Sequence, residues 1–331
     1  AVLAECEREW GATFFGWTAG ANCADAFALM CDSDGMIVKM QLDHYADNGG
    51  SLGSIPQALS NLSRLSVLSL TYNAMSGPIP PSLANLQRLS TLDIGSNNLT
   101  GTIPASLGSL LNLQYLFLND NQLMNSLPLS LTRLSKLQVL ALQNNRLSGS
   151  IPESLGSLHQ LRVLLLSSNT LDGSIPSSLN RLSNLLSLDL TSNTLTGSIP
   201  ATLASLIDLS YLTLGDNGLS GRMPTFIGNL SSLISLDLSD NQLVGSLPSA
   251  VWTLPNLINL DLSYNILTGS LPSSITSLDG ISTLNLSMNG FTGSIPDALG
   301  NLTSLTSLDL SNTQLGSSMP SSLGGLTQLV T

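Results

Sequence analysis

Apolar positions return along this chain in a pattern that repeats every 24 residues, and residues 257–280 (LINLDLSYNILTGSLPSSITSLDG) show one unit of it. The opening of the unit, Leu257-x-x-Leu260-x-Leu262, alternates apolar and variable positions, which predicts a short strand with one buried face. Ile275 and Leu278 predict a short helical or 3-10 arc that closes the coil. Because no single coil can bury its own leucines, the pattern predicts a stack of coils, that is, a repeat solenoid.

Two other residue types keep the same period. Prolines recur every 24 residues from Pro56 to Pro320, and each fixes an extended dipeptide together with the residue before it. Asparagines recur where each predicted strand ends, and we expect their amides to satisfy backbone groups at the turn, as a buried structural ladder. The ladder positions are Asn73, Asn97, Asn121, Asn145, Asn169, Asn193, Asn217, Asn241, Asn265 and Asn289. Strands are expected over residues 66–72, 90–96 and so on to 306–312.

The full repeat, LxxLxLxxNxLxGxIPxxLxxLxx, resembles the plant-type leucine-rich repeat of receptor-kinase ectodomains, receptor-like proteins and polygalacturonase-inhibiting proteins. The resemblance covers residues 51–331 and implies a right-handed superhelix of about 11–12 coils, with a parallel sheet on the concave face and 3-10 or helical outer arcs. Asn125 and Ser317 replace the repeat glycine, and Thr313 stands at a ladder position. No C-terminal cap pattern is present, so the last coil is expected to be uncovered unless further chain or a partner covers it.

Residues 1–50 break the period, and we predict that they form an N-terminal cap. The cap is rich in large aromatic side chains, which bury area efficiently over an exposed first coil; they are Trp10, Phe14, Phe15, Trp17 and Phe27. Cys23 and Cys31 resemble the paired cysteines of the family's cap, which implies a disulfide between them, with two reduced thiols as the alternative. The third cysteine, Cys6, is either a buried thiol or part of an intermolecular bridge.

Composition bears on partners and compartment. The net charge of −11 disfavours nucleic acid or an anionic membrane surface as a partner. No apolar run is long enough for a membrane span. Five N-glycosylation sequons occur, a number that chance can produce in a chain so rich in Asn and Ser; they lie at Asn61, Asn98, Asn229, Asn285 and Asn301. Together with the predicted disulfide, they favour an extracellular protein, secreted or at the cell surface.

The residue types that most often carry catalysis or bind metals are scattered along the chain. His44 and His159 lie in different coils, and the cysteines lack the spacing of a zinc site. One aspartate column, at Asp93, Asp189, Asp237, Asp261 and Asp309, suggests calcium, but one carboxylate per coil is a poor cage. We therefore expect no catalytic residue, no metal and no cofactor, and a protein that is not an enzyme.

The variable strand positions indicate where a ligand binds. Most hold small or polar residues, but three successive coils place apolar side chains outward, at Tyr115, Phe117, Val139, Ala141, Val163 and Leu165. A contiguous apolar patch on this concave face indicates a contact surface, with a covering glycan, a neighbouring chain or sequence drift as the alternatives. An Arg-x-Arg pair, which peptide-receptor relatives often carry here to hold a peptide carboxylate, is absent, and this absence argues against peptide-hormone sensing.

A hydroxyl column two residues before the prolines forms a flank of the coils. It comprises Thr102, Ser126, Ser150, Ser174, Ser198, Ser246, Ser270, Ser294 and Ser318, with Thr100, Thr196, Thr268 and Thr292 beside it. Hydrogen bonding of a second sheet explains this column most simply. O-glycan attachment, lateral packing between solenoids and ice binding are the alternatives.

Two functional hypotheses follow. The first is a non-catalytic extracellular module that recognises a protein or carbohydrate through the concave patch. The second is a structural, self-assembling glycoprotein of a filament, extracellular matrix or cell wall, which packs on other copies of itself through its ends or flanks.

Overall fold

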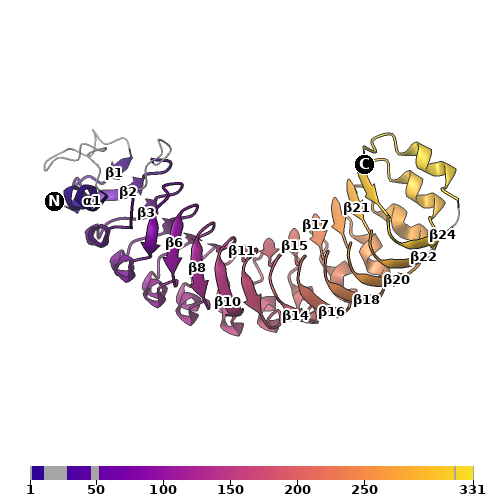
Figure 1. Ribbon diagram of the computed structural model, residues 1–331, viewed down its shortest axis with the longest axis horizontal. Helices are drawn as coiled ribbons and strands as arrows, with labels where there is room; N and C mark the ends of the chain where they lie inside the picture. The colour runs from indigo at the N-terminus through magenta and orange to yellow at the C-terminus, as the bar shows by residue number, and fades with distance from the viewer. Residues whose placement is uncertain (1, 11–27, 46–51, 317, 331) are drawn as a thin grey trace. The chain divides into compact units, whose positions relative to one another are not determined.

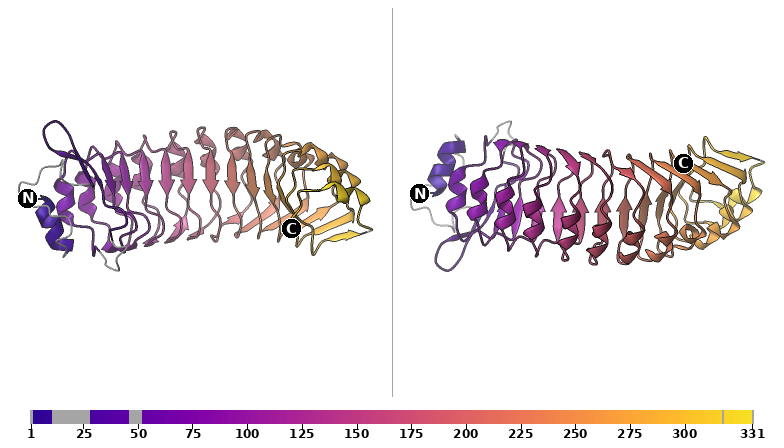
Figure 2. Two further views of the ribbon diagram at one scale, coloured as in Figure 1. Left: turned by 90° about the horizontal axis from the view of Figure 1, so that it is seen from above. Right: turned by 90° about the horizontal axis from the view of Figure 1, so that it is seen from below.

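The computed structural model describes residues 2–10, 28–45, 52–316 and 318–330, which divide into two compact units, Ala1–Thr170 and Leu171–Thr331 (Figure 1). Each unit is a stack of coils with a first sheet on one side and 3-10 segments on the opposite side (Figures 1 and 2). The predicted fold class, a repeat solenoid with parallel strands and 3-10 arcs, is confirmed.

In the first unit, helix α1 (Val2–Trp10) precedes an antiparallel pair of strands, β1 (Leu29–Cys31) and β2 (Ile37–Gln41). The first sheet then continues from β2 by parallel pairing, one strand per coil. Its further strands are β3 (Val67–Ser69), β5 (Thr91–Asp93), β7 (Tyr115–Phe117), β9 (Val139–Ala141) and β11 (Val163–Leu165). A second sheet lies on the flank, with β4 (Ser76–Pro78), β6 (Asn98–Gly101), β8 (Gln122–Asn125) and β10 (Arg146–Ser150); its last strand, β12 (Thr170–Asp172), begins at the final residue of the unit.

The second unit repeats this arrangement. Its first sheet contains β13 (Ser187–Asp189), β15 (Tyr211–Thr213), β17 (Ser235–Asp237), β19 (Asn259–Asp261), β21 (Thr283–Asn285) and β23 (Ser307–Asp309). Its flank sheet contains β14 (Thr196–Gly197), β16 (Gly218–Arg222), β18 (Gln242–Ser246), β20 (Ile266–Gly269), β22 (Gly290–Ser294) and β24 (Gln314–Gly316).

A 3-10 segment of five residues follows each repeat proline, which is its N-cap residue in extended conformation. In the first unit these segments are η2 (Gln57–Asn61), η3 (Pro81–Asn85), η4 (Ala105–Ser109), η5 (Leu129–Arg133) and η6 (Glu153–Ser157). In the second they are η7 (Ser177–Arg181), η8 (Ala201–Ser205), η9 (Thr225–Asn229), η10 (Ser249–Thr253), η11 (Ser273–Ser277), η12 (Asp297–Asn301) and η13 (Ser321–Gly325). Gly300 in η12 allows close stacking, because a Cβ there would lie 2.2 Å from the carbonyl oxygen of Ser322.

The strands of the first sheet are shorter than the predicted ranges. A strand was expected over residues 66–72, but only Val67–Ser69 pairs regularly. The strand ends early because the chain turns through a left-handed conformation at Tyr72 (φ 57°), the residue before ladder position Asn73. The same turn recurs at Asp120 (φ 53°) and Asp240 (φ 48°). The leucines of the repeat pack inside the coils, and Leu116, Leu140 and their equivalents are fully buried.

The ladder asparagines connect neighbouring coils through their side chains. Asn265 donates from Nδ2 to the carbonyl oxygens of Leu238 (2.9 Å), Leu262 (3.2 Å) and Ser263 (3.1 Å). Its Oδ1 accepts the N–H of Leu243 at 2.9 Å. One amide therefore satisfies backbone groups of its own coil and of the preceding one. At the position without asparagine, Thr313 Oγ1 donates to the Leu310 carbonyl oxygen.

Candidate binding face

Strand register assembles the predicted patch into two adjacent rows on the sheet face, the solvent-facing side of the first sheet in the first unit. Tyr115, Val139 and Val163 pair in one row. Phe117, Ala141 and Leu165 pair in the next. Five of these side chains are half-buried, whereas Ala141 is only 1% exposed. Alternation places Ala141 outward, but its methyl group lies between two larger neighbours, so it forms the floor of the patch rather than a contact point.

A polar border precedes the patch, at the residues that enter the strands. The Gln138 side chain accepts from the Tyr115 hydroxyl (3.4 Å) and donates to Gln114 Oε1 (3.3 Å). Arg162 continues this line of residues, since its N–H donates to the Gln138 carbonyl oxygen. Arg162 is exposed, and its guanidinium makes no hydrogen bond or ion pair with the described residues. The border therefore offers a charged donor to an outside partner.

A second polar border follows the patch, where the strands end. Asp120 accepts from Asn119 Nδ2 (2.6 Å) and Asn144 Nδ2 (2.7 Å), so two amides orient its carboxylate. Gln143 lies in the same border, and its Oε1 is buried without a hydrogen-bond partner in the described part of the chain. The patch thus has polar groups on both sides and apolar groups between them.

Asp93 lies beside the patch, because it pairs with Phe117 in the strand register. Burial raises the pKa of Asp93, while the N–H of Gly95 and the nearby Asp43 act on it in opposite directions. The sequence pattern connected Asp93 only with calcium, and the apolar pattern of the variable columns did not point to Gln114, Gln138 or Arg162. The position of these three residues, directly before each patch strand, was the available signal.

The sheet face of the second unit is acidic and hydroxylated rather than apolar. Asp237 Oδ1 accepts the N–H (2.9 Å) and the hydroxyl (2.7 Å) of Ser239, and Asp261 and Ser263 repeat the arrangement. In the same column, the N–H of Ser311 holds the pKa of Asp309 below its usual range. These carboxylates are occupied by their own coils, and no group of three or more potential ligands in the described ranges is placed to hold a metal.

The hydroxyl column lies at the ends of the flank strands and is exposed in its described part, whereas Thr100 beside it is half-buried. In the second unit, Ser246 pairs with Thr268, and the next strand continues with Thr292 and Ser294. These side chains, together with Ser270, make no recorded hydrogen bonds to other described residues. Arg222 takes a serine position of the column on β16, and the exposed Val244 and Ile266 lie two residues before Ser246 and Thr268 on β18 and β20.

The predicted glycosylation sites occupy different sides of the coils. Asn61, Asn229 and Asn301 are exposed at the ends of 3-10 segments, and Asn98 is exposed on the flank strand β6. Asn285 faces the sheet side of the second unit, where its Nδ2 donates to Asp261 Oδ2 at 3.0 Å. No sequon lies on the sheet face of the first unit in the described sequence.

Of the three cysteines, Cys6 and Cys31 lie in the described residues and Cys23 does not. Cys31 is disulfide-bonded, but its predicted partner Cys23 lies outside the described residues, so the pairing stays a prediction. Phe14, Phe15, Trp17 and Phe27 of the predicted cap also lie outside them. Cys6 is a fully buried thiol.

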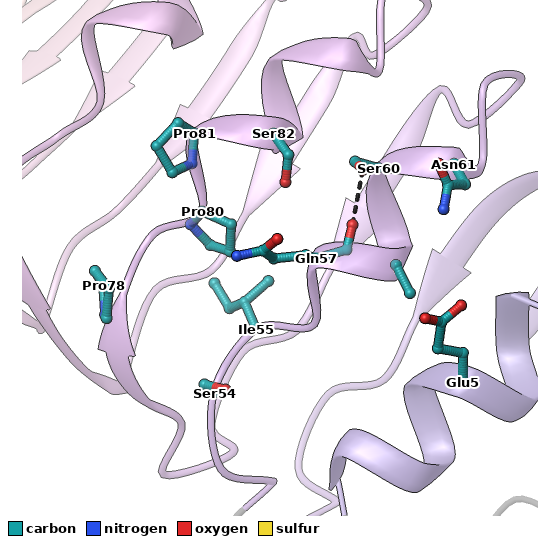
Figure 3. Close-up of a pocket in the computed structure, with 11 residues that line it drawn as sticks. Glu5, Ser54, Ile55, Gln57, Ser60, Asn61, Pro78, Pro80, Pro81 and Ser82 are labelled. Carbon is teal, nitrogen blue, oxygen red and sulfur yellow. Dashed lines mark hydrogen bonds between the residues drawn. The ribbon is translucent and has the colours of Figure 1, made fainter.

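Described residues of the first unit line two grooves. The larger, about 660 Å³, is on the 3-10 side and is lined by Glu5, Gln57, Asn61 and prolines of the first coils (Figure 3). The smaller, about 370 Å³, lies at the start of the first sheet and is lined by Lys39, Gln41, Asp43 and Tyr45 among others. Sequence reasoning predicted neither. No described helix has the length and hydropathy that crossing a membrane requires.

Known proteins resemble this chain over most of its length. A family model described as a leucine-rich repeat region matches residues 53–198, and another described as leucine rich repeat matches residues 209–267 and 255–315. No curated protein matches the chain significantly. Among solved structures, the plant peptide hormone receptor RGFR1 in complex with RGF2 is 37% identical, with a TM-score of 0.82 over 84% of this chain and 44% of the receptor chain. The chain therefore spans less than half the length of that receptor.

Two shorter structures match a larger share of their own length. A leucine-rich repeat protein of Leptospira interrogans is 34% identical, with a TM-score of 0.71 over 85% of this chain and 69% of that one. A plant ice-binding protein is 28% identical, with a TM-score of 0.71 over 82% of this chain and 87% of that one. By its repeat, its coils and these matches, the chain belongs to the leucine-rich repeat family, in its plant-type class.

Proposed function

We propose that the chain is a non-catalytic extracellular binding module whose sheet face in the first unit binds a peptide or a segment of a protein. The observation that carries the proposal is the contiguous set of half-exposed apolar side chains on β7, β9 and β11, between two polar borders. An apolar centre with a polar rim is the usual anatomy of a protein contact. RGFR1, which shares the fold at 37% identity, is a peptide hormone receptor.

The distribution of the sequons supports the same face. A glycan at Asn285 would stand on the sheet face of the second unit, whereas the sequons of the first unit, Asn61 and Asn98, lie on the 3-10 side and the flank. A glycoprotein with this pattern keeps the apolar face of its first unit open. Glycosylation and an extracellular location are tested by mass spectrometry of native material, which should find carbohydrate at one or more of Asn61, Asn229 and Asn301.

Binding is tested with a random-peptide display library selected on the full chain. Phe117→Ser and Val163→Ser should each weaken selected peptides by tenfold or more, because each removes exposed apolar area without opening the core. Tyr211→Ser, at an exposed residue on the sheet face of the second unit, is the matched control and should leave binding unchanged. Selected peptides that ignore Phe117 and Val163, or a glycan array that binds where peptides do not, would contradict a peptide site.

Self-assembly through the ends or flanks remains the alternative, and sedimentation separates it from ligand binding. A monomer at all concentrations contradicts self-assembly. Concentration-dependent growth into filaments, with hydrogen-exchange protection outside β7, β9 and β11, contradicts the binding module.

A second candidate function is ice binding through the flank of the second unit. Ser246, Thr268, Ser270, Thr292 and Ser294 form an exposed, uncharged set on neighbouring strands about 4.8 Å apart, with hydroxyls open to water. A plant ice-binding protein is similar over 87% of its own length. In an assay of ice recrystallisation, Thr268→Lys should abolish inhibition, whereas Thr283→Lys on the sheet face should not. An inactive wild type excludes this function.

A further inference from the structure

In the first unit, basic residues lie before strands β5, β9 and β11, and acidic residues lie at the end of β5 and after β7. Arg162 lies one residue before β11, and Arg88 and Lys136 lie three residues before β5 and β9; together they form the basic edge. Asp120 follows β7, and Asp93 is the last residue of β5, at the acidic edge. The second unit has no such basic edge, because its only basic residues are Arg181 and Arg222, which belong to η7 and β16. The charge separation is thus a property of the face that carries the apolar patch.

The groups at both edges are available to a ligand. Arg162 is exposed and borders the patch directly, next to Val163. Lys136 donates to Asn112 Oδ1 (2.8 Å), a neutral acceptor that leaves its charge uncompensated. At the other edge, Asp120 is held by two neutral amides rather than by a cation. Arg64, by contrast, is neutralised by Asp32 and Asp34 at 2.7 Å each, so it is no part of this edge.

From this arrangement we infer the polarity of the ligand: the sheet face of the first unit takes a short extended peptide that places an acidic group at Arg162, apolar side chains over β7, β9 and β11, and a basic group at Asp120. This inference rests on the proposed binding function. Six residues of a coil separate the level of Arg162 from that of Asp120, which sets an upper limit of about 20 Å along the strand direction at ~3.3 Å per residue, since the chain leaves the strand after Phe117. An extended peptide of about six residues has this reach.

Complementary charges at the rim of an apolar contact fix orientation more than they add affinity. The bidentate fork of Arg162 suits a carboxylate, which is either an Asp or Glu side chain or a free C-terminus. Arg162 and Asp120 therefore determine specificity, because a peptide with the two charges exchanged would place its cation at Arg162 and its anion at Asp120.

The experiment uses the full chain and the peptides selected from the random display library, remade synthetically with free and amidated C-termini. Enriched sequences should carry Asp, Glu or a free terminus at one end and Lys or Arg at the other. Arg162→Glu should weaken them at least tenfold, and replacing the acidic residue of the peptide by Lys should restore binding to that variant. Arg133→Glu, an equal charge change in η5 on the 3-10 side, is the control and should have no effect.

The possible outcomes distinguish the polarity of the ligand from the proposed binding function of the sheet face. Peptides that lose binding on Phe117→Ser but bind Arg162→Glu normally would overturn the polarity and leave the binding face standing. Loss on Arg162→Glu with no rescue by the Lys peptide would also overturn it. Peptides indifferent to Phe117 would overturn the binding face itself. Amidation decides between the two sources of the carboxylate, since only a terminal one is removed by it.

Discussion

Replacing Asn241 by leucine tests whether the asparagine ladder stabilises the coils by hydrogen bonding or only by filling space. Asn241 is 8% exposed, and leucine has nearly the same shape, so the change removes polar contacts with little change in volume. Its Nδ2 donates to the carbonyl oxygens of Leu214 (3.0 Å), Leu238 (3.2 Å) and Ser239 (2.9 Å). Its Oδ1 accepts the Leu219 N–H at 2.9 Å.

The two kinds of contact are not equally replaceable. Each of the three carbonyl oxygens keeps a second donor, namely Asn217 Nδ2, Asn265 Nδ2 and the Asp216 N–H. The Leu219 N–H, in contrast, loses the acceptor on Asn241 inside the stack. A buried polar group without its partner costs about 1–3 kcal/mol, so we expect Asn241→Leu to lower the free energy of unfolding by about 2 kcal/mol.

Denaturant unfolding and amide exchange measure this loss. Gln242→Leu, an amide-to-leucine change at the next residue, is the control, because Gln242 is exposed and should change stability by less than about 0.5 kcal/mol. Exchange at Leu219 should accelerate about 30-fold in Asn241→Leu if the opening is local. Equal stability of the two variants, with unchanged exchange at Leu219, would refute the hydrogen-bonding argument.

Three further predictions follow from the same contacts. Gly300→Ala should destabilise the protein by about 1–3 kcal/mol, because its Cβ would lie 2.2 Å from the Ser322 carbonyl oxygen, whereas Gly280→Ala, with its nearest contact at 3.9 Å, should be neutral by thermal melting. Burial raises the pKa of Asp93, so its ionised form opposes folding, and Asp93→Asn should raise the melting temperature at pH 7. The difference in melting temperature between the variant and the wild type should shrink as the pH falls through the raised pKa towards 3.8. A difference that stays constant with pH would contradict the raised pKa of Asp93. Arg64 lowers the pKa of Asp32, so Arg64→Gln should raise that pKa in an NMR titration, and an unchanged titration would exclude the pair at 2.7 Å.

The fold was predictable because each coil repeats the same local physics. Each repeat proline, such as Pro128 or Pro152, is the residue directly before a 3-10 segment. Each ladder asparagine accepts a backbone N–H of the preceding coil. A period of 24 residues therefore carries both the local conformation and the contact between coils. The strand ends were less predictable, because the left-handed turn at Tyr72 or Tyr264 has no fixed residue type in the sequence.

The binding face was only partly predictable, since alternation tells which way a side chain points but not what surrounds it. Ala141 points outward and is nevertheless buried between Phe117 and Leu165, a consequence of side-chain size across three strands. Arg162 was not predicted as part of the face, because it lies outside the strand and the alternation of side chains does not apply to it. Its backbone N–H bonds the carbonyl oxygen of Gln138, and this bond aligns Arg162 with the patch border. A regular repeat fixes the backbone register between coils. Because of this register, unusual residues in the variable columns of neighbouring coils lie side by side and form one surface. For this chain, specificity is therefore expected to lie in the few positions that depart from the repeat.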